Sequence, residues 1–572
     1  MKQINNVLFA TAFLSLSLSA AAQTAKTAKK DSTLNRVVIV EKEYNPDIMD
    51  ASKVNVLPKV QEPSVSKKKI EYNTSVLPFS AFSDVMKPVT SNLDQEKAKR
   101  GYARLGYGNN GNVDAKINYL FNLSKRDQLG ASASLDGMNG TLKLPEIFET
   151  AYANRNWKSR YYRTTLDVDY QHQFDKMIFD AALNLGTDNF NYHPFMDAAD
   201  VLYPIATDKQ HHSKWSLHAG LASLDKSLPL QFTAETDFLS FKQSYPYGST
   251  ESIWRIKGDV YGQISEGQHV GVKAEMNNLF YSDDSNYSSL NLNPYYSFSN
   301  DSWKVRLGAH VDLSTYGRYM DGRNISPIQL APDFEVQYLF AKSYVAYVKM
   351  GGGREQNDFR RMESMNPYAN FSRLNDSYTH LDAVLGLKAN VGGGFWFDAF
   401  AGYKTITDDL CFYNLGFYSN TNMAILRFTT ADTKYFYVGS NLKYNYKGIA
   451  DFSLKGTYYS WHNSKSLYML MKPNFDLQFN ADIKILPELA VNAGYKYIGR
   501  NNVVFSSSFP EETYHDIKLD PINDLSLGGT YNLQKGISIF ARINNILNQT
   551  YQYNYSYPAQ GVNFLGGVSF QF

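Results

Sequence analysis

Histidines and aspartates between residues 193 and 212 come closest, by residue type, to a site of metal chemistry. The group consists of His193, His211 and His212 together with Asp197, Asp200 and Asp208. Imidazole and carboxylate groups are ligands of transition metals, but this spacing matches no established ligand pattern. We therefore interpret these residues as solvated members of a long loop, and the sequence predicts no metal site.

Two pairs of adjacent carboxylates could contribute to calcium binding in outer loops. Asp283 and Asp284 form one pair, and Asp408 and Asp409 form the other. Calcium takes several oxygen ligands, often from carboxylates. We favour ordinary solvated carboxylates as the interpretation of both pairs.

Four tyrosines alternate near the C-terminus: Tyr551, Tyr553, Tyr555 and Tyr557. Side chains two positions apart share one face of a strand, so the four rings could stack on sugars. We favour a second interpretation, the belt of aromatic residues that membrane barrels carry at the membrane–water interface.

The sequence contains no GxSxG, HExxH or paired-carboxylate signature of an enzyme. The glycine runs at 351–353 and 392–394 are not followed by a predicted helix, so they indicate bends rather than phosphate-binding loops. We predict that the protein is not an enzyme and has no cofactor.

Composition narrows the possible classes of protein. Aromatic residues make up 15% of the 572 residues, which is too many for a disordered chain. The 57 Lys and Arg residues nearly balance 55 Asp and Glu residues, and this balance excludes nucleic-acid binding driven by overall charge. The single cysteine, Cys411, excludes internal disulfides and Cys-based zinc clusters.

The N-terminus has the pattern of a secretory signal peptide. Lys2 precedes an apolar run from Leu8 to Leu18, and small residues follow up to Ala22. The pattern predicts a signal peptide over residues 1–22 and an exported chain. No later window approaches 18 apolar residues, so we predict no transmembrane helix.

From about residue 100, apolar and polar residues alternate with a period of two. Between Trp303 and Ser314, the odd-numbered residues are apolar and the even-numbered residues are polar, charged or glycine. Because side chains alternate across a strand, one face of this strand is apolar. Strands of about ten residues cross a membrane at a tilt, so the pattern predicts a transmembrane β-barrel rather than a soluble sandwich.

Ten tight turns join pairs of alternating segments. They are predicted at 124–127, 173–176, 225–229, 265–268, 299–302, 340–343, 391–394, 446–448, 486–488 and 532–536. Longer connections lie between these hairpins, at 137–160, 187–213, 351–380, 407–434 and 499–524. Short periplasmic turns that alternate with long extracellular loops are typical of outer-membrane barrels. With a first strand at 101–108 and a last at 562–572, the ten hairpins predict an all-β, antiparallel barrel of about 22 strands over residues 100–572.

The last thirty residues resemble the C-terminus of TonB-dependent outer-membrane receptors. Asn545-Ile546-Leu547-Asn548, followed by Tyr551, matches the stretch that comes after the penultimate strand in that family. A loop with a proline and glycines follows, and the chain ends on Phe572, which resembles the signal read by the barrel-assembly machinery. The resemblance implies an outer-membrane barrel that binds a nutrient at its outer loops and imports it.

Residues 23–99 depart from that family, whose members carry a plug domain before the barrel. The segment is shorter than a full plug and contains no series of predicted strands. Val37, Val38, Ile39 and Val40 resemble the short extended segment that such receptors offer to TonB, and a β-rich segment can add a strand to a partner sheet. Alternatively, this run pairs within the protein's own N-terminal region.

Two functions remain open from the sequence. The first is import of a nutrient across the outer membrane, and the second is a non-transporting barrel in an envelope complex. Under both functions the expected partners are the lipid bilayer of the outer membrane and the barrel-assembly machinery, and no nucleic acid is expected. TonB is a further possible partner, and so is a surface lipoprotein or another envelope protein. A ring of 22 strands encloses a wide lumen, which residues 23–99, inward-folded loops or a second protein must fill.

Overall fold

The computed structural model describes residues 99–144, 156–193, 209–225, 227–244, 248–315, 326–341, 343–413, 426–463, 472–501, 503–507, 513–517, 519–555 and 557–572. The predicted signal peptide and the run from Val37 to Val40 lie outside these residues. Within the described residues, no helix has the length and apolar character needed to cross a bilayer.

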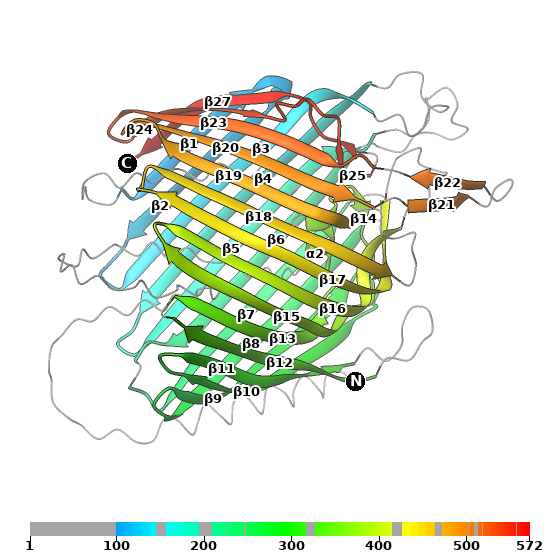
Figure 1. Cartoon of the computed structure of the whole chain (residues 1–572). Helices are drawn as coiled ribbons and strands as arrows, with labels where there is room; N and C mark the ends of the chain where they lie inside the picture. The colour runs from blue at the N-terminus through cyan, green and yellow to red at the C-terminus, as the bar shows by residue number, and fades with distance from the viewer. Residues whose placement is uncertain are drawn as a thin grey trace. The chain divides into compact units, whose positions relative to one another are not determined.

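Twenty-two antiparallel strands of the described residues form one closed β-barrel (Figure 1). The first eleven are β1 (Gly101–Gly108), β2 (Val113–Asn122), β3 (Asp127–Lys143), β4 (Asn156–Gln173), β5 (Met177–Asn191), β6 (Lys209–Ser223), β7 (Leu230–Gln243), β8 (Ser249–Ser265), β9 (Gln268–Tyr281), β10 (Tyr287–Ser299) and β11 (Trp303–Ser314). The other eleven are β12 (Ile328–Phe340), β13 (Tyr344–Glu355), β15 (Ser377–Gly392), β16 (Phe395–Tyr413), β17 (Leu426–Tyr446), β18 (Ala450–Asn463), β19 (Pro473–Lys484), β20 (Leu489–Arg500), β23 (Ile522–Gln534), β24 (Ile537–Asn544) and β27 (Asn563–Gln571). Because β1 pairs with both β2 and β27, the ring has no free edge, as a sheet in lipid requires.

The smaller elements lie in connections at the rim opposite the tight turns. They are η1 (Asn109–Gly111), α2 (Phe359–Met365), β14 (Ala369–Asn370), β21 (Val503–Ser507), β22 (Thr513–Ile517), β25 (Gln552–Asn554) and β26 (Tyr557–Pro558). All ten predicted tight turns fall between consecutive barrel strands, and the strand count of 22 is confirmed. The ranges 101–108 and 303–314 agree with the bounds of β1 and β11.

The expected strand length of about ten residues is wrong for most of the barrel. Many strands continue into the predicted long connections, and β16 and β17 have 19 and 21 residues. The reason is that the ladders extend beyond the apolar band at the long-loop rim. There, residues such as Leu410 and Phe428 are apolar and buried, so the alternation that marks a membrane strand disappears although the pairing continues.

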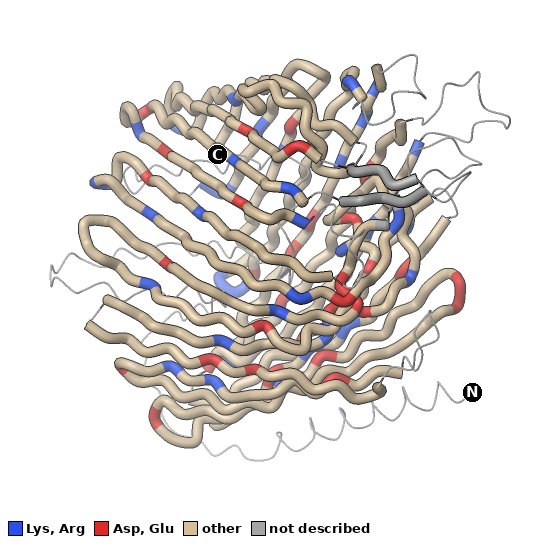
Figure 2. Tube along the Cα trace, turned by 45° about the vertical axis from the view of Figure 1, so that its right-hand side comes forward, with Lys and Arg blue, Asp and Glu red and all other residues tan. Residues whose placement is uncertain are grey.

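The outer face of the barrel is apolar and the inner face is polar. Leu307, Leu385 and Phe436 point outward and are 44%, 64% and 64% exposed. On the opposite face of β11, the Arg306 Nε donates a hydrogen bond to Asp333 at 2.8 Å. Figure 2 shows charged residues recurring along most strands, as alternation of the two faces requires.

Arginine at Leu307 is expected to destabilise the membrane-embedded barrel by about 2–4 kcal/mol, because a cation then faces lipid near the bilayer midplane. Val311, on the same face of β11, is expected to respond in the same way. Heat-modifiable gel migration of barrels from outer-membrane fractions measures the effect. Asn480→Arg on the lumen face of β19 serves as the matched control, and an equal loss of assembly there would contradict the assignment of faces.

On the inner face, three tyrosines each connect a set of three neighbouring strands. Each ring lies over a glycine of the next strand, where a Cβ would overlap it, and its hydroxyl donates to an aspartate one strand further on. The trios are Tyr295–Gly271–Asp259 (3.0 Å), Tyr347–Gly386–Asp398 (2.9 Å) and Tyr437–Gly402–Asp382 (2.8 Å), with the hydroxyl–carboxylate distances in parentheses.

Candidate functional site: the lumen cap

The connection between β13 and β15 folds into the barrel. We call residues 356–376 the crossing loop; it contains α2 and β14. Near α2, Glu363 contacts Lys214 of β6, whereas β14 pairs in parallel with β17. β6 is the sixth strand of the ring and β17 the sixteenth, so they lie nearly opposite each other. The crossing loop therefore reaches from β13 and β15 across the lumen to the wall at β6 and β7, and the end of β17 contacts it there.

Local interactions fix the shape of the crossing loop. Asp358 caps α2 by accepting a hydrogen bond from the Arg361 amide at 2.7 Å. The side-chain amide of Gln243 on β7 hydrogen-bonds the backbone on both sides of β14: it donates to the Ala369 carbonyl (2.8 Å) and accepts from the Phe371 amide (2.9 Å). This buried pairing substitutes for a neighbouring strand and satisfies backbone groups that water cannot reach.

A second inward segment is the C-terminal connection, residues 545–562. Its tyrosines Tyr551, Tyr555 and Tyr557 are buried, and each belongs to a different apolar cluster. Tyr557 stacks on Tyr368 of the crossing loop with ring centroids 3.8 Å apart. We call the crossing loop and the C-terminal connection together the lumen cap.

The lumen cap has an apolar core of its own. The largest cluster comprises Phe241, Ile253, Leu279, Tyr281, Tyr287, Phe359, Met362, Met365, Ala369, Phe371, Leu410, Phe412, Phe428, Leu519 and Tyr555. Four large side chains of the crossing loop belong to it, and burying each contributes about 1.5–3 kcal/mol, or about 6–12 kcal/mol together. The crossing loop is therefore a packed part of the fold.

Asn545 and Asn548 hold the start of the C-terminal connection. Both have positive φ angles, of 47° and 53°, which asparagine tolerates better than most residues. The Asn545 side chain donates to the carbonyls of Gln549 and Gln560, both at 2.8 Å, and the Tyr551 hydroxyl donates to Asp524 at 2.6 Å. The C-terminal motif thus has a structural role: it directs this connection back into the lumen.

Comparisons with known proteins agree with this architecture. No protein-family model and no curated protein matches the sequence. Among solved structures, the FrpB iron transporter from Neisseria meningitidis matches with a TM-score of 0.63 at 10% identity, over 83% of each chain. The ferric enterobactin receptor from Pseudomonas aeruginosa matches at 0.62 and 10% identity, over 84% of this chain and 82% of the receptor. The copper transporter OprC matches at 0.58 and 13% identity, over 83% and 80%.

The chain has the barrel fold of TonB-dependent outer-membrane receptors. A closed barrel of 22 strands with an apolar outer face belongs in the outer membrane, as predicted. The resemblance drawn from Asn545–Asn548, Tyr551 and the chain end is therefore confirmed for the fold of the barrel.

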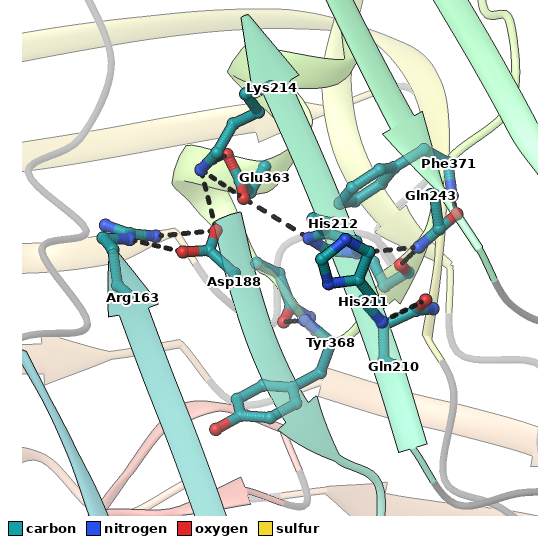
Figure 3. A network of polar contacts seen from close by, with 12 residues as sticks. Arg163, Asp188, Gln210, His211, His212, Lys214, Gln243, Glu363, Tyr368 and Phe371 are labelled. Atoms are coloured by element: carbon teal, nitrogen blue, oxygen red, sulfur yellow. Dashed lines mark hydrogen bonds and ion pairs between the residues drawn. The ribbon is translucent and has the colours of Figure 1, made fainter. Parts of the chain in front are cut away.

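A network of charged residues anchors the crossing loop to the inner wall of the barrel (Figure 3). The Lys214 Nζ donates to Asp188 Oδ2 at 2.7 Å and to both Glu363 oxygens at 2.8 and 2.9 Å. The Arg163 Nε donates to Asp188 Oδ1 at 2.9 Å, and His212 Nδ1 lies 3.3 Å from Glu363 Oε1. We call these five residues the Glu363 network.

Three members of the Glu363 network have the chemistry of metal ligands. Single ligand atoms of Asp188, His212 and Glu363 lie within 4.8 Å of one another, and all three residues are buried. However, the Lys214 ammonium already contacts both carboxylates, and with Arg163 it balances their two negative charges. A divalent cation would add uncompensated positive charge to a buried site. We therefore interpret the cluster as an ion-pair network whose cation is Lys214.

The Glu363 carboxylate is expected to stay ionised in mild acid. Burial alone would raise the pKa of Glu363, but hydrogen bonds with Asp188 and His212 and the charge of Lys214 outweigh it and hold the pKa well below the ordinary 4.5. In the same pair, burial and the charge of Glu363 raise the pKa of Asp188, so Asp188 takes up a proton before Glu363 does. A depressed folded-state pKa gives stability that is complete above about pH 4.5 and is lost as pH falls through the lowered value. The Glu363 carboxylate should accordingly still contribute to stability at pH 5, and the difference in thermal stability between wild type and Glu363→Gln should shrink in stronger acid.

The interpretation of the histidines as solvated loop residues is wrong for two of them. His212 lies on β6 and is fully buried against Glu363, and His193 is buried between Trp157 and Tyr557. Only His211, also on β6, is exposed. The reason is that β6 continues to Lys209, above the apolar band, and its inner face packs on the cap. Asp197, Asp200 and Asp208 lie outside the described residues.

The interpretations of the carboxylate pairs and the tyrosines also need correction. Asp409 is buried in an ion pair with Lys472, and Asp408 is buried as well, so this pair is not solvated. Asp283 and Asp284 sit in an exposed turn, where Asp283 accepts hydrogen bonds from Ser285. The expected aromatic belt is wrong for Tyr551, Tyr555 and Tyr557, because the connection turns into the lumen instead of continuing along the membrane surface.

Both glycine runs are bends, as predicted. Gly351–Gly353 lies at a register shift between β13 and β15, and Gly392, Gly393 and Gly394 all have positive φ angles in a tight turn.

The sequence analysis named inward-folded loops as one of three possible fillings of the lumen but did not identify the residues of the lumen cap, although one signal was present. On β7, Glu235 and Asp237 lie on the lumen face, and the same face continues with Leu239 and Phe241 toward the loop rim. Apolar residues at lumen positions indicate that something packs inside the barrel at that height.

Proposed function

We propose that this protein is an outer-membrane receptor that binds a nutrient ligand at its extracellular rim and imports it through the barrel. The observation that carries the proposal is the closed 22-stranded barrel, which shares its fold with proteins described as iron and copper transporters and as a ferric enterobactin receptor. A barrel of this width encloses a lumen large enough for a ligand but requires an internal closure.

The proposal includes energised uptake through contact with TonB. Val37, Val38, Ile39 and Val40 are β-branched residues that favour an extended chain and can add a strand to a partner sheet. About 60 residues separate Val40 from Gly101, and at about 3.3 Å per extended residue they reach about 200 Å. The start of β1 lies at the tight-turn rim, which is the periplasmic side in such barrels, so the run is within reach of a periplasmic partner.

Proline at position 38 or 39 is expected to abolish uptake and leave barrel assembly unchanged. Proline removes the backbone donor that a strand pairing with TonB needs. The experiment combines growth on a panel of nutrients with photo-crosslinking from position 38 to TonB in cells. Val38→Thr keeps the donor and the β-branched shape and serves as the control. Normal growth of both proline variants on every nutrient, together with no crosslink, would exclude energised import.

A second candidate function is a non-transporting component of an envelope complex, bound to a surface lipoprotein or another envelope protein. The lumen cap favours it, because a stably packed crossing loop opposes the passage of a ligand. The same experiment separates the two candidate functions. If the protein is a non-transporting component, cells with the proline variants take up every nutrient as wild-type cells do. The crosslink from position 38 then joins an envelope protein that copurifies with the barrel, and not TonB.

A further inference from the structure

We infer that the lumen cap is the permeability seal of this barrel: at rest it closes the lumen to ions and small solutes. The inference goes beyond the proposed function, because a sealed lumen is needed whether the barrel imports a nutrient or serves a complex. Three observations on the described residues carry it.

The first observation is that the cap contacts the wall around most of its circumference. The large apolar cluster joins the cap to β7–β10, β16 and β17. A second cluster joins Tyr557 and Tyr368 to β3, β4 and β5, and a third joins Tyr551 to β20 and β23. The Glu363 network adds an ion pair between the cap and Lys214 of β6. The cap is therefore attached to strands on several sides of the ring.

The second observation is the chemistry at the centre of the cap. Phe359, Met362 and Phe371 are at most 2% exposed, and the wall residues Phe241, Ile253 and Leu279 that face them are 1% exposed. An ion that entered such a buried apolar contact would lose its hydration without gaining polar partners. Apolar constrictions close membrane pores by this mechanism.

The third observation is that several hydrogen bonds join the cap to the wall. The Phe359 amide donates to Glu251 at 2.9 Å, and Gln243 pairs with the backbone around β14. The Tyr287 hydroxyl donates to Asp376 at 2.7 Å at the end of the crossing loop. Pairs of this kind hold a segment in one position, because displacing it would leave each buried partner unsatisfied.

The test is single-channel recording of the full-length protein in planar bilayers. Wild type is expected to remain at baseline. The double variant Phe359→Ser/Met362→Ser places two hydroxyls in the centre of the cap and is expected to show the steady conductance of a water-filled barrel. Asp482→Asn lies on the lumen face near the tight-turn rim, outside the cap, and is expected to remain closed.

Heat-modifiable migration establishes that each variant forms a barrel before recording. If the double variant does not assemble, Tyr557→Ala, which lies outside the barrel strands, removes the stack on Tyr368 and provides the same readout. Sensitivity of cells to a large antibiotic that intact outer membranes exclude gives a second measure of leak. A steady conductance of the wild type, or closed channels and unchanged antibiotic sensitivity in every assembled cap variant, would overturn the inference. Because neither readout depends on TonB or on uptake, a failure here is distinct from a failure of the proposed function.

Discussion

Replacing Gly402 by valine is expected to prevent assembly of a stable barrel. A side chain at this position would overlap the ring of Tyr437, whose hydroxyl donates to Asp382 at 2.8 Å. Overpacking costs about 1–3 kcal/mol, and loss of a partly buried hydrogen bond costs about 0.5–1.5 kcal/mol more, which makes about 1.5–4.5 kcal/mol together. Yield of heat-modifiable barrel in outer-membrane fractions measures the outcome.

The matched control is Gly258→Val on β8. A Cβ there would meet no atom closer than the Thr233 carbonyl oxygen at 3.7 Å, so normal assembly is expected. Combining Gly402→Val with Tyr437→Ala removes the ring and should restore much of the yield. If Gly402→Val assembles as well as Gly258→Val, the ring of Tyr437 does not need the space over Gly402. The trio of Tyr437, Gly402 and Asp382 is then not a structural unit.

Replacing Lys214 by methionine is expected to destabilise the lumen cap by about 3–5 kcal/mol, the usual cost of removing one partner of a buried ion pair. The side chains of Asp188 and Glu363 are 0% and 7% exposed, and without the ammonium only Arg163, on Asp188, remains as a cation. Proteolysis of the crossing loop in detergent-solubilised barrels measures the loss. Lys214→Arg keeps the charge and should retain most of the protection.

Zinc is expected to restore the cap in Lys214→Met but to leave the wild type unchanged. With the ammonium gone, the ligand atoms of Asp188, His212 and Glu363 are close enough to bind one metal ion, and zinc accepts this mixture of nitrogen and oxygen. Protection that increases with zinc and disappears with a chelator would show it. Equal stabilisation of the wild type by zinc would mean that the network binds metal with Lys214 present, contrary to the charge argument.

The barrel could be predicted from the sequence because its signals are local. Apolar and polar positions alternate within single strands such as β11, and a few turn residues, such as those between Tyr446 and Ala450, end each hairpin. Counting hairpins therefore gave the correct number of strands without knowledge of any long-range contact.

The lumen cap could not be predicted in the same way, because its contacts join distant parts of the chain. Glu363 and His212 are 151 positions apart, and Gln243 lies 126 positions from its partner Ala369. The expectation that the alternating tyrosines share one strand face is wrong, because only Tyr553 and Tyr557 lie in strands, and these are the two short strands β25 and β26. The run from Val37 to Val40 lies outside the described residues, and its contact with TonB stays a prediction.

The place of the C-terminal connection in the chain has a consequence for biogenesis. Tyr551, Tyr555 and Tyr557 lie between β24 and β27, and β27 is the strand that closes the ring against β1. Residues 545–571 therefore complete both the wall and its closure. Before β27 pairs with β1, the barrel is open and its cap is incomplete. Once β27 has paired with β1, the connection that carries the three tyrosines lies inside the barrel. Insertion into the membrane can thus proceed without a stage at which a complete and unobstructed pore exposes the cell.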